Sequence, residues 1–274
     1  MIQHASIDGT SLAFSEEGSG PPLVFVHGGF TDHRIWAPQV VEFERSHQCI
    51  AIDQRYFGLS WQESGPPFSL ATHGHDLCQF ISKVSADPVH VVATSYGSAV
   101  SLYAAVECPW LVKSLFLNEP SLASIVTDAA DQALLASERK SMAPVTKALA
   151  DNNAQLAVQL FCDWTAFPGA FASLPTEDQA IFLDNARTIG PHFAAPAPTV
   201  MQAQIAALEI PVAFTVGEHT RPFFRTMLRA ACQAIPSAAV TVIPRAHHGA
   251  PFENAAAFNA ALLSHLTRDR RPAG

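Results

Sequence analysis

Short apolar segments recur along this 274-residue chain, and helix-like stretches separate most of them. Each segment has a few residues, is rich in β-branched side chains and lacks polar alternation, as strands do when helices cover both faces of their sheet. Strands that alternate with helices form parallel sheets through right-handed crossovers. The segments are 21–29, 49–53, 89–95, 112–118, 211–217 and 238–244. The sequence therefore predicts an α/β fold.

Two further features complete the predicted sheet. Residues 4–8 and 11–18 flank the turn Asp8-Gly9 and predict an antiparallel hairpin at the sheet edge. Helices are expected over 72–84, 97–107, 221–234 and 254–266. With the hairpin included, the pattern gives roughly eight strands.

One block, 121–207, interrupts the alternation of strands and helices. It contains no convincing strand, but helical stretches over 128–140, 144–165 and 175–188 and then a proline-rich exit, "PHFAAPAPTV". An insertion of this length between two strands is typical of a lid over a site. We therefore expect a core of residues 1–120 and 208–274 and a helical cap of residues 121–207.

Composition restricts the classes of partner. The net charge is −8 and the pI about 5.8, which speaks against nucleic acid because phosphate binding needs clustered Lys and Arg. No apolar run approaches the roughly 20 residues that span a bilayer, and no secretory signal is visible. The cysteines have no zinc-site spacing, so we expect reduced thiols and no metal: Cys49, Cys78, Cys108, Cys162 and Cys232. These features predict a soluble cytoplasmic protein, either a monomer or a homodimer, that acts on a small molecule.

The segment 89–94 runs directly into a helix-like stretch at Ser95, with Ala93 and Gly97 two positions to either side. Such a sharp turn needs small residues at these positions, and it exposes the serine hydroxyl above the sheet beside a helix N-terminus. An ordinary helix N-cap is the alternative, since serine favours that position. The apolar strand before Ser95 and a histidine far downstream favour a nucleophile.

With this motif the chain resembles the α/β-hydrolase family. The resemblance covers nearly the whole chain and rests on the order and spacing of "VFVHGG", "IDQRYFGLS", "ATSYGSA" and "VIPRAHHGAPFENAAAFNAALLSHL". Ala93 stands where the stricter pattern has glycine. The resemblance implies the α/β-hydrolase fold: a mostly parallel eight-stranded sheet flanked by helices, with an inserted helical cap.

The resemblance also implies roles for single residues. Ser95 would attack an acyl carbon and form a covalent intermediate. The family places its general base just before the final helix, which favours His248 over the adjacent His247. The backbone N–H groups of Gly29 and Tyr96 would form the oxyanion hole, although the glycines also suit a simple tight turn.

The acid of the triad departs from the commonest pattern. The family usually has Asp three residues after the glycine that ends "PVAFTVG", and Thr220 stands there instead. A threonine cannot carry the charge that stabilises an imidazolium. Glu218 is one substitute, but it comes early in its loop. Glu119, at the end of the strand after the nucleophile helix, occupies the other acid position known in the family and is favoured, because neighbouring strands lie roughly 5 Å apart.

Other residues add detail to the expected site. Asp53 is expected to hold its loop by hydrogen bonds, and His27 to be structural. Serine at position 95 excludes the dehalogenase and epoxide hydrolase mechanisms, which use an aspartate nucleophile. Aromatic residues of the cap are often core, but with the cap over Ser95, Trp164 and Phe30 would line an apolar pocket.

We therefore expect a serine hydrolase without a cofactor that cleaves a small, largely apolar ester or lactone. A carbon–carbon bond hydrolase acting on a diketone or ring-cleavage product would share the same triad. A hydrolase-fold protein that binds a ligand without turnover is the alternative from another functional class.

Overall fold

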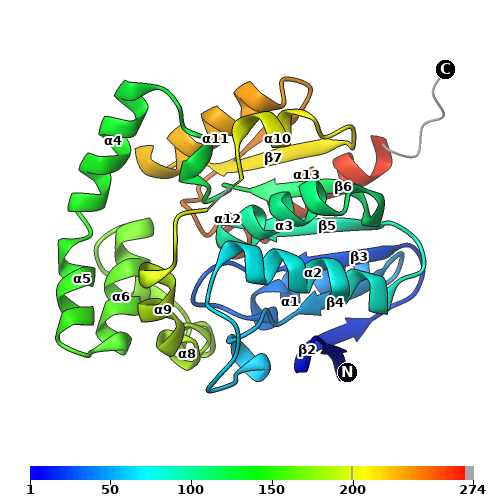
Figure 1. The fold of residues 1–274 in the computed structure, drawn as a ribbon, viewed down its shortest axis with the longest axis horizontal. Coiled ribbons are helices and arrows are strands. Elements are labelled where there is room, and N and C mark those ends of the chain that lie inside the picture. Colours follow the sequence, from blue (N-terminus) through cyan, green and yellow to red (C-terminus); the bar gives the residue numbers. More distant parts are fainter. Residues whose placement is uncertain (199, 269–274) are drawn as a thin grey trace.

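The computed structural model describes residues 1–198 and 200–268, and it has an eight-stranded sheet in the order β1-β2-β4-β3-β5-β6-β7-β8 (Figure 1). β1 pairs antiparallel with β2, and β2 with β4; all other neighbours are parallel. The strands are β1 (Ile2–Ile7), β2 (Thr10–Glu17), β3 (Pro22–Val26), β4 (Gln48–Ile52), β5 (Val89–Thr94), β6 (Val112–Asn118), β7 (Val212–Gly217) and β8 (Ala239–Ile243). The predicted α/β architecture and the edge hairpin are confirmed.

Helices cover both faces of the sheet (Figure 1). Successive side chains of a strand point to opposite faces, so β3 sends Val24 and Val26 into one core and Leu23 and Phe25 into the other. The first core includes α2, α3 and α11, and the second α1 and α13. The core helices are α1 (Ala37–Phe43), α2 (Leu70–Val84), α3 (Tyr96–Glu107), α11 (Pro222–Ala234), α12 (Ala250–Glu253) and α13 (Ala255–Arg268).

Residues 121–198 and 200–207, which we call the cap, contain helices and no strand. They lie beside the ends of β6 and β7 toward which the arrowheads point in Figure 1. The cap helices are α4 (Ala129–Lys140), α5 (Ala143–Ala150), α6 (Ala154–Thr165), α7 (Ala170–Ser173), α8 (Thr176–Asp184), α9 (Ile189–Ala194) and α10 (Gln202–Ala206). Short 3₁₀ turns occupy His33–Trp36, Gly58–Ser60, Pro109–Leu111, Ala123–Ile125 and Ala186–Thr188.

Three local expectations differ from the structure. The helix expected over 144–165 is two helices, because Asn152 has a positive φ of 55° and Asn153 caps α6 by accepting from Leu156 N–H. The proline-rich exit begins with α9, in which His192 lies. The final strand, β8, is an edge strand and leaves Val240 and Val242 exposed, so it is not covered on both faces.

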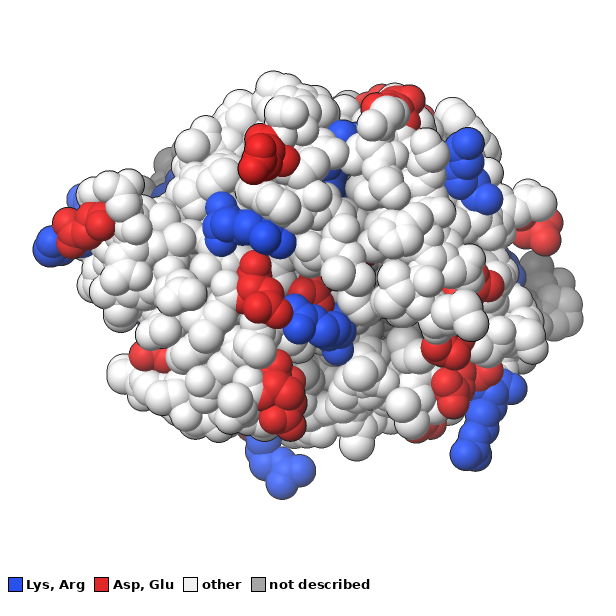
Figure 2. All heavy atoms as spheres, turned by 90° about the horizontal axis from the view of Figure 1, so that it is seen from below, with Lys and Arg blue, Asp and Glu red and all other residues white. Residues whose placement is uncertain are grey.

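The surface and the thiols also bear on the expected partners. On the face in Figure 2, acidic and basic side chains are scattered over a mostly uncharged surface and form no broad basic patch. Among the described helices, none has both the length and the apolar character that crossing a membrane requires. All five cysteines are free thiols.

Candidate active site

Ser95 lies at the turn between β5 and α3 with an unusual backbone, φ 53° and ψ −116°. Such a conformation costs about 1–3 kcal/mol in a residue other than glycine and persists only where its surroundings impose it. Here the Ser95 N–H donates to the carbonyl of Asn118 at 2.8 Å, and the Ser95 carbonyl accepts from Ser121 N–H at 3.1 Å. A Cβ at Gly97 would lie 2.3 Å from the His27 carbonyl oxygen, so only glycine fits there.

His248 lies in the loop between β8 and α12. Its Nε2 is 2.8 Å from Ser95 Oγ, and its Nδ1 is 2.5 Å from Glu119 Oε2. A carboxylate only accepts hydrogen bonds, so Nδ1 carries the proton and Nε2 accepts from the serine hydroxyl. The ring of Phe224 stacks on the imidazole at 3.6 Å and 14°, and the Asn118 side-chain amide donates to the His248 carbonyl at 3.1 Å. Both contacts fix the position of His248.

Glu119 follows β6 directly, and its side chain is completely buried. Its positive φ of 43° turns the chain out of the strand. Besides His248, two donors reach its other oxygen, Oε1: the Gly217 N–H at 2.8 Å and the Thr220 hydroxyl at 2.5 Å. A buried carboxylate needs such partners because desolvation is costly. Thr220, at the position of the missing aspartate, thus donates to the carboxylate on the neighbouring strand.

The two competing residues have other partners. Glu218 accepts from the backbone N–H of Arg245 at 2.8 Å on the surface, and no contact joins it to His248. The ring of His247 pairs with Glu253 at 3.1 Å. The structure therefore brings Ser95 together with His248 and Glu119, and not with His247 or Glu218.

The loop after β3 faces Ser95. The Gly28 carbonyl accepts from the buried His27 ring at 2.7 Å and from the Thr31 hydroxyl at 3.2 Å. Because a trans peptide directs its N–H opposite to its C=O, the Gly29 N–H points away from these two donors. Neither it nor the Tyr96 N–H donates to an acceptor within the described residues. Two unpaired N–H groups therefore belong to residues that line the same cavity as Ser95, one of them at the N-terminus of α3.

His27 has a structural position. It is fully buried, burial lowers the pKa of its imidazole, and its Nε2 accepts from the Gln54 N–H at 3.0 Å. Asp53 accepts from the N–H groups of His33 and Leu59, both at 2.8 Å, and so holds the loop after β4.

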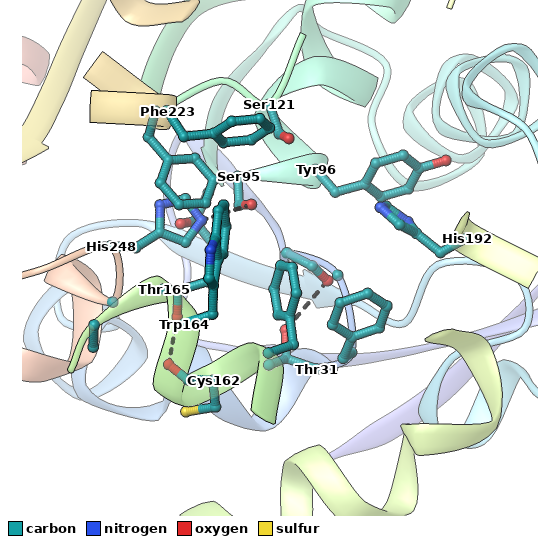
Figure 3. A pocket seen from close by; sticks show the side chains of 18 of the residues that line it. Thr31, Ser95, Tyr96, Ser121, Cys162, Trp164, Thr165, His192, Phe223 and His248 are labelled. Carbon is teal, nitrogen blue, oxygen red and sulfur yellow. Dashed lines mark hydrogen bonds between the residues drawn. The ribbon is translucent and has the colours of Figure 1, made fainter. Parts of the chain in front are cut away.

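A cavity of about 1050 Å³ opens above Ser95 between the core and the cap (Figure 3). Its size is slightly above the range of about 300–1,000 Å³ that is usual for small-molecule sites. Phe30 and Trp164 line it, as expected if the cap lies over the serine. Other aromatic residues of the wall are Phe161, Phe167, Phe193, Phe223 and Phe224. The Cys162 thiol also lies there, but burial raises its pKa to about 12 and keeps it protonated.

A polar cluster joins the cap to the core. Asp32 accepts from the side chains of Arg34 and of Asn185, the latter in the cap, at 2.7 Å. Arg34 in turn donates to Asp184 at 2.8 Å. Asp32, His33 and Asp53 lie close enough to share a cation, but hydrogen bonds within the protein already occupy their ligand atoms. The cluster is a fixed contact between cap and core.

A family model described as the alpha/beta hydrolase fold matches residues 21–255, which is most of the chain. The chain belongs to this family. Haloalkane dehalogenase 2 from Mycobacterium bovis is 28% identical over 107 residues, or 39% of this chain and 37% of the relative. The chain thus spans less than half the length of this curated relative.

Solved structures show the same fold. Carboxylesterase CesB from Bacillus subtilis superposes with a TM-score of 0.75 at 15% identity, over 97% of this chain and 91% of the other. A hydrolase from Pseudomonas aeruginosa gives 0.74 at 22% identity, over 97% and 98%. At these identities the likeness concerns the fold, and the chemistry must be argued from the residues of the site.

Three residues beside the site were not anticipated in these positions. Thr220 was noted only as a missing acid, Phe224 had no distinguishing signal, and His192 lies in the stretch that was expected to be an irregular exit. Each makes its contact across a large sequence separation, which single-sequence patterns do not carry.

Proposed function

We propose that this family member is a serine hydrolase that cleaves a small, largely apolar ester or lactone through an acyl-enzyme on Ser95, without a cofactor. One observation supports this most strongly. A continuous chain of hydrogen bonds runs from the buried Glu119 through His248 to the hydroxyl of Ser95, which opens into an aromatic cavity. This is the arrangement that activates a serine nucleophile.

The first half-reaction forms the acyl-enzyme. Ser95 Oγ attacks the carbonyl carbon of the ester while His248 Nε2 takes the hydroxyl proton. Negative charge develops on the carbonyl oxygen, where the N–H groups of Gly29 and Tyr96 are free to donate. Glu119 stabilises the imidazolium, and His248 then gives its proton to the leaving alcohol.

The second half-reaction regenerates the enzyme. Water replaces the alcohol, His248 removes a proton from it, and the resulting hydroxide attacks the acyl carbon. The tetrahedral intermediate collapses, Ser95 leaves with the proton from His248, and the carboxylic acid is released. In a lactone the leaving alcohol stays attached to the acyl group, so one product forms.

The curated relative named above acts on haloalkanes, which calls for a different nucleophile. Displacement of a halide through an alkyl-ester intermediate requires a carboxylate, and this chain has a serine hydroxyl at position 95. The apolar wall of the cavity suits either substrate class, so the nucleophile decides in favour of acyl transfer.

A hydrolysis screen with p-nitrophenyl acyl esters, lactones and diketones tests the proposal. We expect turnover of esters or lactones, reduced by several orders of magnitude in Ser95→Ala. Ser98→Ala removes a neighbouring buried hydroxyl of α3 and is the matched control, expected to remain active. Turnover of diketones alone would favour the carbon–carbon bond hydrolase, and turnover of esters or lactones by Ser95→Ala at the wild-type rate would overturn the proposal.

A further inference from the structure

His192 of α9 is a polar residue in an otherwise aromatic part of the cavity wall. Its ring meets those of Tyr96, Phe30 and Phe68 edge-on, with centroids 4.8, 5.1 and 5.8 Å away. A Cβ built on Gly29 would lie 3.8 Å from its Cε1. A cap residue thus packs against both residues whose N–H groups face the reacting carbonyl.

Neither ring nitrogen of His192 has a hydrogen-bond partner among the described residues. Nδ1 is enclosed by protein atoms and has no partner, whereas Nε2 is not enclosed in this way, and the residue lines the cavity. Burial lowers the pKa of the imidazole to about 4, so the ring is neutral at neutral pH and carries one proton. A buried N–H without an acceptor is rarer in proteins than a buried acceptor without a donor. We therefore assign the proton to Nε2 and leave the enclosed Nδ1 as the unprotonated nitrogen. Because His192 lines the cavity, an N–H on Nε2 is available to a ligand bound there.

The location of His192 indicates which part of the substrate it would contact. In Figure 3, His248 and His192 lie on opposite sides of Ser95. His248 must protonate the leaving group, which therefore lies on its side. His192 lies on the other side, next to Tyr96, and we assign this side to the acyl group.

We propose that His192 Nε2–H donates a hydrogen bond to an oxygen carried by the acyl group of the substrate, close to the scissile carbonyl. This inference rests on the proposed function and narrows its substrate class. The preferred esters or lactones have an oxo, hydroxy or ether oxygen on the acyl chain, and plain alkanoyl esters are poorer substrates. When a plain acyl group is bound, the buried His192 N–H has no acceptor, and the cost of removing it from water is not compensated. This cost explains the selectivity.

Two esters of equal leaving group test the inference: p-nitrophenyl butyrate and p-nitrophenyl β-hydroxybutyrate. We expect the wild-type kcat/KM to favour the hydroxy ester by about tenfold, the usual order for one buried hydrogen bond made or left unmade. His192→Phe keeps an aromatic ring and removes the donor, so the ratio of the two kcat/KM values should fall to near one. His192→Gln restores an N–H near the Nε2 position and should recover part of the ratio.

The ratio within one variant is the decisive quantity, since a structural defect would lower both rates together. A wild-type ratio near one, or an unchanged ratio in His192→Phe, would overturn the inference while leaving a Ser95-dependent esterase intact. If no ester or lactone of the screen is turned over, or if Ser95→Ala turns over both esters at the wild-type rate, the proposed function itself fails. The wild-type ratio carries the test even if His192→Phe does not fold.

Discussion

Glu119→Gln removes one charge from the proposed triad and keeps the shape of the side chain. The carboxylate accepts from His248 at one oxygen and from two donors, the Gly217 N–H and the Thr220 hydroxyl, at the other. An amide has one oxygen and one NH₂ group to offer these partners. Its orientation therefore decides which tautomer the imidazole adopts.

The structure predicts the unproductive orientation. If the amide oxygen stays at the Oε1 position, it serves both Gly217 and Thr220, but the NH₂ group faces His248 Nδ1. The imidazole then carries its proton on Nε2 and no longer accepts from Ser95. The flipped amide would set NH₂ against the Gly217 N–H, a buried donor that cannot rotate, at a cost of about 1–3 kcal/mol.

Both orientations also lack the charge that stabilises the imidazolium. We expect kcat to fall by about 10⁴-fold, the loss typical of the corresponding aspartate-to-asparagine change in a serine triad. Steady-state kinetics on the best ester from the screen measures the loss, and circular dichroism checks the fold.

Glu218→Gln is the matched control, because its amide oxygen still accepts from the Arg245 N–H on the surface. We expect wild-type kinetics from it. A Glu119→Gln enzyme that keeps more than about a tenth of the wild-type kcat would refute the role assigned to the buried carboxylate, as would an equal loss in Glu218→Gln.

Three further results are expected. Thr220→Val removes one donor to the buried carboxylate and should lower kcat by about tenfold. It should also lower the thermal stability, because a hydrogen bond to a charged group contributes about 1.5–3 kcal/mol. An unaltered Tm would contradict this. His247→Gln should keep most activity and His248→Gln should lose it, and the reverse result would reassign the base. Burial disfavours the charged form of His33, but its hydrogen bond to Asp53 outweighs this and raises its pKa. The ion pair therefore stabilises the fold fully below pH 6.5, the ordinary pKa of histidine, and this contribution is lost as the pH rises through the raised pKa of the folded state. Urea titrations across this pH window should show a smaller decline of the free energy of unfolding in His33→Gln than in the wild type.

The sequence was sufficient for the framework of the fold because strand and helix patterns are local. Segment 89–94 is mostly apolar, and all six residues of β5 are buried. The break between α5 and α6 was missed, although an asparagine at a helix N-cap is a local signal. The exposed faces of β8 were not readable, because an edge and a central strand can have the same composition.

The candidate site was only partly accessible from the sequence. Ser95 and His248 stand in recognisable contexts, and the missing aspartate at Thr220 pointed to Glu119 on another strand. That the Thr220 hydroxyl binds this carboxylate depends on β6 lying beside β7, a pairing of segments about a hundred residues apart. The contact of His192 with Tyr96 depends on how the cap sits on the core, for which no local pattern exists.

The central claim is that Ser95 is an activated nucleophile, and labelling with a fluorophosphonate tests it most directly. We expect one phosphonyl group per native chain, located on the peptide that contains Ser95 and accompanied by complete loss of esterase activity. Heat-denatured protein and Ser95→Ala should remain unlabelled. Native protein that does not react at Ser95, or that keeps its activity after full labelling, would contradict the account.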